Sequence, residues 1–219
     1  RAGKDISPER LLDIFFSLKK QGAANINLVT PSHYLPALAP VLQEARASGL
    51  DLPIVYNTGG YEYSEALRLL DGLVDIYLPD FKYMDPALAA RYSQAPDYPD
   101  RAKEALAEMV RQTGEAVFDE AGMMKRGVIV RHLALPGQLS DSMSVLAYLH
   151  ETYGEQIFLS IMNQYTPMPG IEKTFPELGR KLSADEYDTL VDYAVLLGVE
   201  NGFIQEGDTA EESFIPPFD

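Results

Sequence analysis

The sequence contains no cysteine in its 219 residues. This absence excludes disulfides, thiolate zinc sites, cysteine nucleophiles and cysteine-ligated iron–sulfur clusters within the chain. Basic residues are also scarce, because 18 Lys and Arg stand against 33 Asp and Glu and the formal net charge is −15. Nucleic acids and anionic membrane surfaces are bound through clustered Lys and Arg, so the charge argues against both as main partners.

Long apolar runs are absent as well. No stretch approaches the roughly 18–20 residues that span a bilayer, and no secretory leader is recognisable, so we expect a cytoplasmic protein. With 46% hydrophobic and 23% charged residues, the composition is that of a globular chain. The length suits one domain of roughly 100–250 residues with a sizeable core. We therefore expect residues 1–219 to form a single domain.

Short apolar segments alternate with amphipathic segments along the whole chain. The first predicted helix begins with Ser7 as its N-cap and Pro8 at its first position, and Ser183 and Glu186 cap the last helix. Short strands separated by helices imply right-handed βαβ crossovers, and therefore an α/β fold with a parallel sheet. The predicted strands are Asn25–Val29, Leu52–Tyr56, Val74–Leu78, Gly127–Leu133, Gln156–Met162 and an edge strand at Phe203–Gln205.

Hydrogen-bonding and charged residues follow these strands, at the edge of a parallel sheet where ligands bind. Asp80 and Lys82 lie two residues apart, so their side chains leave the strand end on the same side. Alone, such a pair is more often a structural ion pair. The planar guanidinium of Arg131 suits a carboxylate ligand, and a partner such as Asp80 is the alternative. The strand-end residues that we consider are Thr30, His33, Asn57, Thr58, Asp80, Lys82, Arg131, His132 and Gln164.

Motifs of other chemistries are missing. The sequence has no phosphate-cradling Gly-x-x-x-x-Gly-Lys, no Gly-x-Gly-x-x-Gly, no Gly-x-Ser-x-Gly and no His-Glu-x-x-His. Two of the three histidines, His33 and His132, could meet Asp80 in a metal site, but polar lining of the sheet edge is the favoured interpretation. His150 falls within a predicted helix and is interpreted as a surface residue.

The strand ends resemble those of radical S-adenosylmethionine enzymes, and within them the branch of pyruvate formate-lyase activating enzymes. The resemblance runs in order over nearly the whole chain and includes Glu211–Pro216 near its end. The stretches that carry it are Asn25–His33, Ile54–Glu62, Val74–Tyr83, Met124–Leu133 and Met162–Tyr165.

The resemblance implies a partial (β/α)6 TIM-like barrel whose mouth holds S-adenosylmethionine. Asp80 and Lys82 match an Asp-x-Lys motif near the amino and carboxylate groups of this cofactor. Thr30 stands where the family has a Gly-Gly-Glu stretch, so the contact of that Glu is replaced or lost. The cofactor-binding residues implied in this way are Thr30, Asn57, Thr58, Asp80, Lys82, Arg131 and Gln164.

One departure from the family is large. Its members carry a Cys-x3-Cys-x2-Cys loop that binds a [4Fe–4S] cluster, which cleaves S-adenosylmethionine reductively to a 5′-deoxyadenosyl radical. This sequence begins about where that loop would end, so the first strand and the cluster loop are missing. The resemblance therefore implies an oxidoreductase with a protein substrate, a glycyl radical enzyme, for an intact parent. It implies an inactive chain on its own.

Two alternatives stay open beside this interpretation. One is a cluster-less module that binds a small anionic or nucleoside-like ligand, and the other is a barrel-type lyase or aldolase that uses Lys82 as a Schiff-base nucleophile. Loss of the first strand also leaves Asn25–Val29 at the edge of the sheet with unpaired backbone groups. We therefore expect a dimer through this edge strand or a protein of limited stability.

Overall fold

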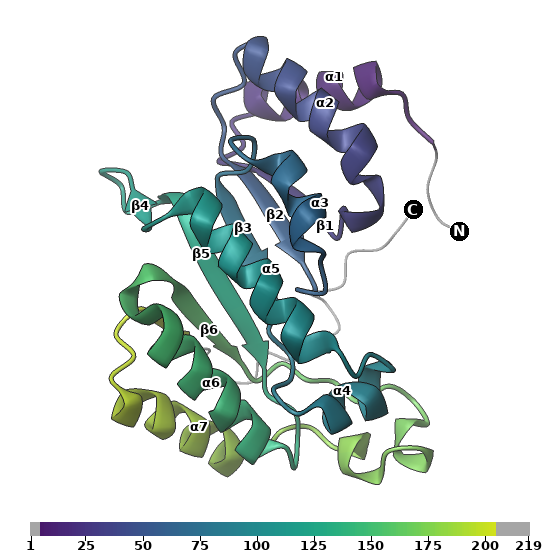
Figure 1. Cartoon of the computed structure of the whole chain (residues 1–219), viewed down its shortest axis with the longest axis vertical. Helices are drawn as coiled ribbons and strands as arrows, with labels where there is room; N and C mark the ends of the chain where they lie inside the picture. Colours follow the sequence, from purple (N-terminus) through teal and green to yellow (C-terminus); the bar gives the residue numbers. More distant parts are fainter. Residues whose placement is uncertain (1–4, 205–219) are drawn as a thin grey trace. The chain divides into compact units, whose positions relative to one another are not determined.

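The computed structural model describes residues 5–204, in which parallel strands alternate with helices (Figure 1). The helices are α1 Pro8–Lys20, α2 Leu35–Ala47, α3 Ser64–Leu67, α4 Pro86–Ser93, α5 Tyr98–Thr113, α6 Leu139–Tyr153 and α7 Ala184–Leu197. The strands are β1 Ile26–Val29, β2 Ile54–Thr58, β3 Ile76–Pro79, β4 Val117–Phe118, β5 Met124–Leu133, β6 Phe158–Met162 and β7 Gly202–Ile204. None of the helices within residues 5–204 is both long and apolar enough to cross a bilayer.

Hydrogen bonds join the strands in the order β1-β2-β3-β5-β6-β7, and each neighbouring pair runs parallel. The predicted parallel α/β architecture is therefore confirmed. Within the described residues β1 stands at one end of this order, as the sequence predicts. The residue Gln205 of the predicted last strand and the segment Glu211–Pro216 lie outside the described residues.

Local signals place the helix ends correctly. The Ser7 hydroxyl accepts a hydrogen bond from the amide of Arg10 at 3.2 Å and caps α1. Ser183 and Glu186 form a reciprocal capping box at the start of α7. The strand β4 was missing from the prediction, because two residues are too few to show an alternating pattern. It pairs antiparallel with the start of β5, which for this reason begins at Met124 and not at Gly127.

The described residues divide into two compact units. The first unit comprises residues 5–79 and 103–128, and the second comprises residues 80–102 and 129–204. The division falls within β5, whose residues up to Val128 belong to the first unit. In the first unit Ile54, Val55 and Tyr56 of β2 are all buried, as expected for a parallel strand that is covered on both faces. The prediction of a single domain stays a prediction.

Candidate functional site

The ends of β3 and β5 bring an acidic and a basic side chain together in the second unit. Asp80, directly after β3, forms a parallel bridge with Arg131 of β5, and the amide of Phe81 donates to the Arg131 carbonyl at 2.8 Å. The guanidinium Nη2 lies 2.7 Å from Oδ1 of Asp80, and the two side chains are 26% and 23% exposed. The Asp80 carboxylate is therefore paired with Arg131. This is the alternative that the sequence left open, in which Arg131 pairs with Asp80 and not with the carboxylate of a ligand.

Two opposing influences act on the Asp80 carboxyl. Burial raises its pKa above the usual range, whereas the nearby cations Arg131 and Lys82 act in the opposite direction. The net direction is upward, because removal of the carboxylate from water outweighs the attraction of the two cations. A further cation in contact with Asp80 would favour the ionised form.

Lys82 is held by its backbone and leaves its ammonium group available. The amide of Lys82 donates to the Tyr98 hydroxyl, and this hydroxyl donates to the Asp80 carbonyl, both at 3.0 Å. Tyr98, at the start of α5, thus fixes the turn that follows β3. The Lys82 side chain is exposed, and no residue within 5–204 forms an ion pair or hydrogen bond with its ammonium group.

A cavity of about 270 Å³ lies beside these charges in the second unit. One part of its wall is charged and the rest is apolar or aromatic. Sequence reasoning missed the aromatic and apolar members, although the register that pairs Leu133 with Met162 would have placed two of them together. Its lining residues are Asp80, Lys82, Tyr83, Arg131, Leu133, Leu135, Met162 and Tyr165.

Gln164 follows β6 but does not line this cavity. Its side-chain amide donates to the sulfur of Met162 at 3.3 Å. The neighbouring residue Tyr165 lines the cavity instead, and its hydroxyl donates to the Leu178 carbonyl at 2.9 Å. Tyr165 is therefore the residue that the segment after β6 contributes to this cavity.

The other predicted cofactor-binding residues, Thr30, Asn57 and Thr58, belong to the first unit. The amide of Thr30 donates to the Asn57 carbonyl at 2.8 Å, so these two residues follow β1 and β2 side by side. Thr30 has a φ of 50°, which is rare for a β-branched residue and marks local backbone strain at this strand end. Thr30 and Asn57 belong to the first unit, whereas Asp80 and Arg131 belong to the second.

Thr58 is directed into the protein by a buried glutamate that sequence reasoning missed. Glu62 is 5% exposed and accepts hydrogen bonds on one oxygen from three hydroxyl groups. Those of Ser32 and Tyr56 lie at 2.5 and 3.4 Å, and the Thr58 hydroxyl is the third donor. Glu62 therefore ties the segment after β1 to the loop after β2.

His132 is a buried neutral side chain of the second unit. It is 3% exposed, and its Nδ1 lies 2.8 Å from the Phe81 carbonyl oxygen. A carbonyl only accepts, so Nδ1 carries the proton, and the buried Nε2 has no hydrogen-bond partner among residues 5–204. Burial accordingly lowers the pKa of His132. Within the described residues no three His, Asp or Glu side chains gather as metal ligands.

Stability is expected to fall as the pH drops below about 6.5, the ordinary pKa of histidine. The unfolded chain then binds a proton at His132 that the folded chain rejects, so the free energy of unfolding decreases by up to about 1.4 kcal/mol per pH unit. His132→Asn retains a side-chain donor for the Phe81 carbonyl and should remove this slope between about pH 5 and 6.5. Urea unfolding at several pH values measures it.

The exposed His33 provides the control for this experiment. His33→Asn makes the same change at a side chain that is exposed in the folded chain, so the difference between the two variants isolates the effect of burial at His132. An unaltered slope in the His132→Asn variant would contradict the assignment of a neutral, buried imidazole.

No family model matches the chain. A domain of a pyruvate-formate lyase-activating enzyme from Bacteroides vulgatus superposes with a TM-score of 0.56 at 13% identity, covering 83% of this chain and 99% of that one. Streptococcus suis SuiB, whose crystal structure is bound to S-adenosylmethionine, superposes with a TM-score of 0.63 at 12% identity, covering 100% of this chain and 48% of SuiB.

One curated protein is similar in sequence. An uncharacterised protein of Methanocaldococcus jannaschii is 26% identical over 176 residues, which are 80% of this chain and 47% of that protein. The chain thus spans about half the length of this relative. The structural comparisons show that the chain has the α/β fold of radical S-adenosylmethionine enzymes, with the parallel sheet of a partial TIM-like barrel. This confirms the fold that the resemblance implied.

The residues present do not fit one of the cofactors of such enzymes. A [4Fe–4S] cluster is held by cysteine thiolates, and the sequence has none. The charged cavity beside Asp80, Lys82 and Arg131 is of a different kind, because its donors and acceptors suit an organic zwitterion.

Proposed function

We propose that the cavity at the ends of β3, β5 and β6 binds the amino-acid part of S-adenosylmethionine. The observation that carries this proposal is the combination of one carboxylate, Asp80, with two cations, Lys82 and Arg131, around a single small cavity. A free amino acid presents an ammonium and a carboxylate group, which is the complementary pair of charges. The fold shared with SuiB, which was crystallised with S-adenosylmethionine, supports the choice of ligand.

Each charged residue has a distinct task in this proposal. Asp80 accepts hydrogen bonds from the ligand ammonium, and this contact favours its ionised form against the effect of burial. Lys82 donates to the ligand carboxylate, because its ammonium has no competing partner among residues 5–204. Arg131 is oriented by its pair with Asp80 and adds a second positive charge.

The size and walls of the cavity restrict what it holds. Sites for whole drug-sized ligands measure about 300–1,000 Å³. The cavity of about 270 Å³ falls just below this range, so it suits one part of S-adenosylmethionine, such as the amino-acid moiety, better than the whole cofactor. Leu133 and Met162 form an apolar wall against which the methylene groups of such a moiety can pack.

The chemistry of the cofactor needs partners that this sequence does not contain. Together with a reduced iron–sulfur cluster, S-adenosylmethionine supplies radical chemistry, and the protein's part is binding and orientation. We assign no redox step to these 219 residues, because they hold no thiolate. Activation of a glycyl radical enzyme is the finer proposal, supported by the likeness to an activating-enzyme domain, and it requires cluster ligands from elsewhere.

A cluster-free binding module is the second candidate function, and the absence of cysteine favours it. It uses the same cavity and the same charges, so binding of S-adenosylmethionine alone does not separate the two candidates. Reconstitution of the full-length gene product with iron and sulfide separates them, because of these two candidates only the radical enzyme would take up a cluster.

Lys82→Met is expected to weaken binding of S-adenosylmethionine by about tenfold, since one charge-assisted hydrogen bond is lost. Lys82→Arg should recover part of the affinity. Titration calorimetry with S-adenosylmethionine, methionine and 5′-deoxyadenosine measures the effect, which should appear for the first two ligands only. Lys173→Met changes an exposed lysine of the same unit away from the cavity and should bind as the unmodified chain does.

Two results would argue against this function. Absence of binding to the folded chain at millimolar S-adenosylmethionine would leave only a shared scaffold. Borohydride trapping of a carbonyl compound on Lys82 would favour a lyase that forms a Schiff base.

A further inference from the structure

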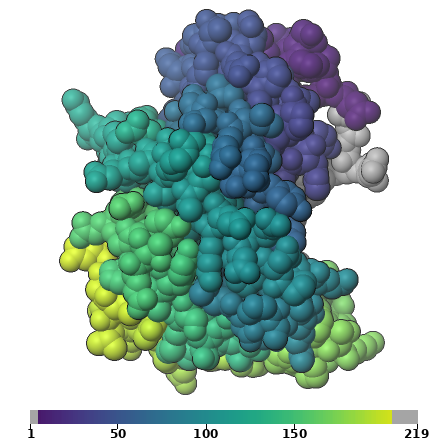
Figure 2. Space-filling view, in the orientation of Figure 1, coloured from purple at the N-terminus to yellow at the C-terminus, as the bar shows by residue number. Residues whose placement is uncertain are grey.

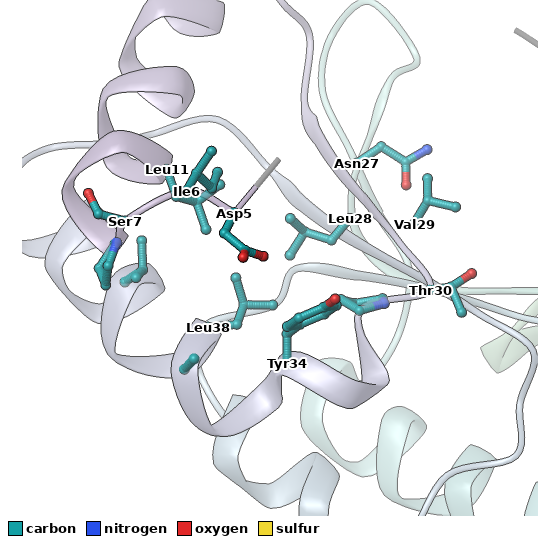
Figure 3. Close-up of a pocket in the computed structure, with 14 residues that line it drawn as sticks. Asp5, Ile6, Ser7, Leu11, Asn27, Leu28, Val29, Thr30, Tyr34 and Leu38 are labelled. Atoms are coloured by element: carbon teal, nitrogen blue, oxygen red, sulfur yellow. The ribbon is translucent and has the colours of Figure 1, made fainter. Parts of the chain in front are cut away.

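Cavities of different character lie in the two units. The one in the first unit measures about 500 Å³ and lies along β1 and α2 (Figure 3). Asp5 is the one charged side chain among the described residues that line it, and Figure 3 shows Leu11, Leu28 and Leu38 around the same space. Such a surface offers no pair of opposite charges to a zwitterion. An amino-acid ligand therefore fits the charged cavity of the second unit, whose uncharged walls determine how firmly it is held.

Two tyrosines form walls of the charged cavity on either side of β5. Tyr83 follows β3 and Tyr165 follows β6, and β5 lies between these two strands in the sheet. Arg131 and Leu133 of β5 line the cavity between them. The separation of the two tyrosines therefore sets the width of the cavity.

Each of these tyrosines is anchored to an element outside the cavity. The hydroxyl of Tyr83 lies 3.1 Å from the hydroxyl of Ser93, at the end of α4. The hydroxyl of Tyr165 donates to the Leu178 carbonyl at 2.9 Å, within the short 3-10 helix η5, Pro176–Gly179. The width of the cavity thus depends on how α4 and η5 are held relative to each other.

One carboxylate outside the cavity joins these two elements. Oε1 of Glu177, in η5, accepts hydrogen bonds from the Arg91 guanidinium and the Tyr92 hydroxyl of α4, both at 2.7 Å. The Tyr92 hydroxyl accepts from the Gln138 amide at 3.0 Å, so its own proton is directed to Glu177. The rings of Tyr92 and Phe175 meet edge to face at 5.2 Å. In Figures 1 and 2 this light-green part of the chain lies beside α4. We call Glu177 with Arg91 and Tyr92 the Glu177 clamp.

The Glu177 clamp is formed at neutral pH. The hydrogen bond from Tyr92 and the charge of Arg91 hold the pKa of Glu177 below its usual range. Burial and the hydrogen bond to Glu177 raise the pKa of Tyr92 to about 12, so this hydroxyl keeps its proton. The side chains of Arg91 and Glu177 are 50% and 26% exposed, and pairs so accessible to water contribute little to overall stability. The consequence of the clamp is therefore local.

We infer that Glu177 is a positioning residue for the ligand of the charged cavity. By holding η5 against α4, it keeps Tyr165 in place opposite Tyr83. This inference rests on the function proposed above and adds control of that site by a residue that does not line it. Without the clamp η5 separates from α4 and Tyr165 moves with it, so the ligand must order this wall when it binds. That ordering weakens binding.

Removal of the carboxylate tests the inference. Glu177→Ala should weaken binding of S-adenosylmethionine about fivefold in titration calorimetry, while the thermal midpoint stays within about 3 °C. Glu177→Gln keeps an acceptor for the Tyr92 hydroxyl and should lose less. Asp192→Ala is the control, because it removes an exposed carboxylate of α7 in the same unit that does not line the cavity. It should bind as the unmodified chain does.

A double-mutant cycle shows whether Glu177 acts through Tyr165. Tyr165→Phe keeps the ring and removes its hydrogen bond to Leu178, so it should weaken binding by a similar factor. Once this connection is cut, the clamp no longer reaches the cavity. The combined variant should therefore lose about fivefold, whereas independent effects would give about 25-fold. A general electrostatic or structural effect of Glu177 would be additive.

The outcomes separate the inference from the proposed function. Unchanged affinity in Glu177→Ala, or additive losses in the combined variant, would overturn the inference and leave the proposed function standing. An equal loss in Asp192→Ala would assign the effect to net charge and overturn the inference as well. Failure of the unmodified chain to bind S-adenosylmethionine would instead overturn the proposed function, and the inference with it.

Discussion

Replacing Arg131 with methionine is expected to lower the free energy of unfolding by about 2–4 kcal/mol at neutral pH. The substitution leaves the Asp80 carboxylate, which is 23% exposed, without its ion-pair partner. Burial already raises the pKa of Asp80, and loss of the guanidinium raises it further. The folded variant then holds a proton that the unfolded chain releases above about pH 4, so its stability falls as the pH rises. Urea unfolding at about pH 4.5 and 7.5 should show the larger loss at the higher pH.

A double-mutant cycle isolates the pair itself. Asp80→Asn keeps a hydrogen-bond acceptor and removes the charge, so combining it with Arg131→Met should cost about 1–3 kcal/mol less than the sum of the single changes. Arg91→Met is the control, because this arginine pairs with Glu177 on the surface at 50% exposure and should cost less than about 1 kcal/mol. Additive effects of the two substitutions would show that the pair contributes nothing at this strand end.

The fold was predictable because its signals are local and repeated. Capping residues such as Ser7 and Ser183 act within one helical turn, so their geometry follows from the sequence around them. Apolar strands that are buried on both faces stand out between amphipathic helices. β4 is too short to show such a pattern. The division into two units depends on tertiary contacts, which no local pattern encodes.

The candidate site was predictable only where neighbouring strands end together. Asp80 and Arg131 meet because they directly oppose each other in the register of adjacent parallel strands. Tyr83 and Tyr165 come from segments beyond the strand ends, where no period indicates the direction of a side chain. The convergence of Asn57 and Gln164 with Asp80 stays a prediction.

Thr58 shows how a strand boundary decides the orientation of a side chain. The sequence predicted a strand that ends at Tyr56, whereas β2 continues to Thr58. The alternation therefore extends over two more residues and gives Thr58 the same side as Tyr56, where both hydroxyls donate to Glu62. Glu62 itself follows in the loop, and only the folded chain reveals that it is the shared acceptor.

The second large effect is expected at the amino ends of the strands, in the first unit. The guanidinium of Arg46, on α2, donates to the carbonyls of Leu50 and Leu52 at 3.0 Å and of Leu73 at 3.4 Å. It also pairs with the Asp75 carboxylate, which in turn accepts from the amide of Ile54 at 2.7 Å. One side chain thus satisfies the loops that lead into β2 and β3.

Arg46→Met should lower the free energy of unfolding by about 3–5 kcal/mol, because three carbonyls and a partly buried carboxylate lose their donor at once. Arg46→Lys should recover only a small part, since one ammonium cannot reach all the acceptors on the two loops. Chemical unfolding measures both, with the exposed Arg10→Met as the control, which should stay within about 0.5 kcal/mol of the unmodified chain. A loss below about 1 kcal/mol for Arg46→Met would contradict the role assigned to this cluster.

The two charged clusters should therefore respond to substitution in opposite ways. At Arg46 both terminal nitrogens of the guanidinium donate to groups of the protein, so its replacement lowers stability and leaves the affinity of the folded fraction for S-adenosylmethionine unchanged. At Lys82 the ammonium is free of partners among residues 5–204, so its replacement lowers affinity and leaves stability within about 0.5 kcal/mol. This reciprocal result, measured by calorimetry and urea unfolding on the same preparations, distinguishes a charge that holds the fold from one that is kept available for a ligand.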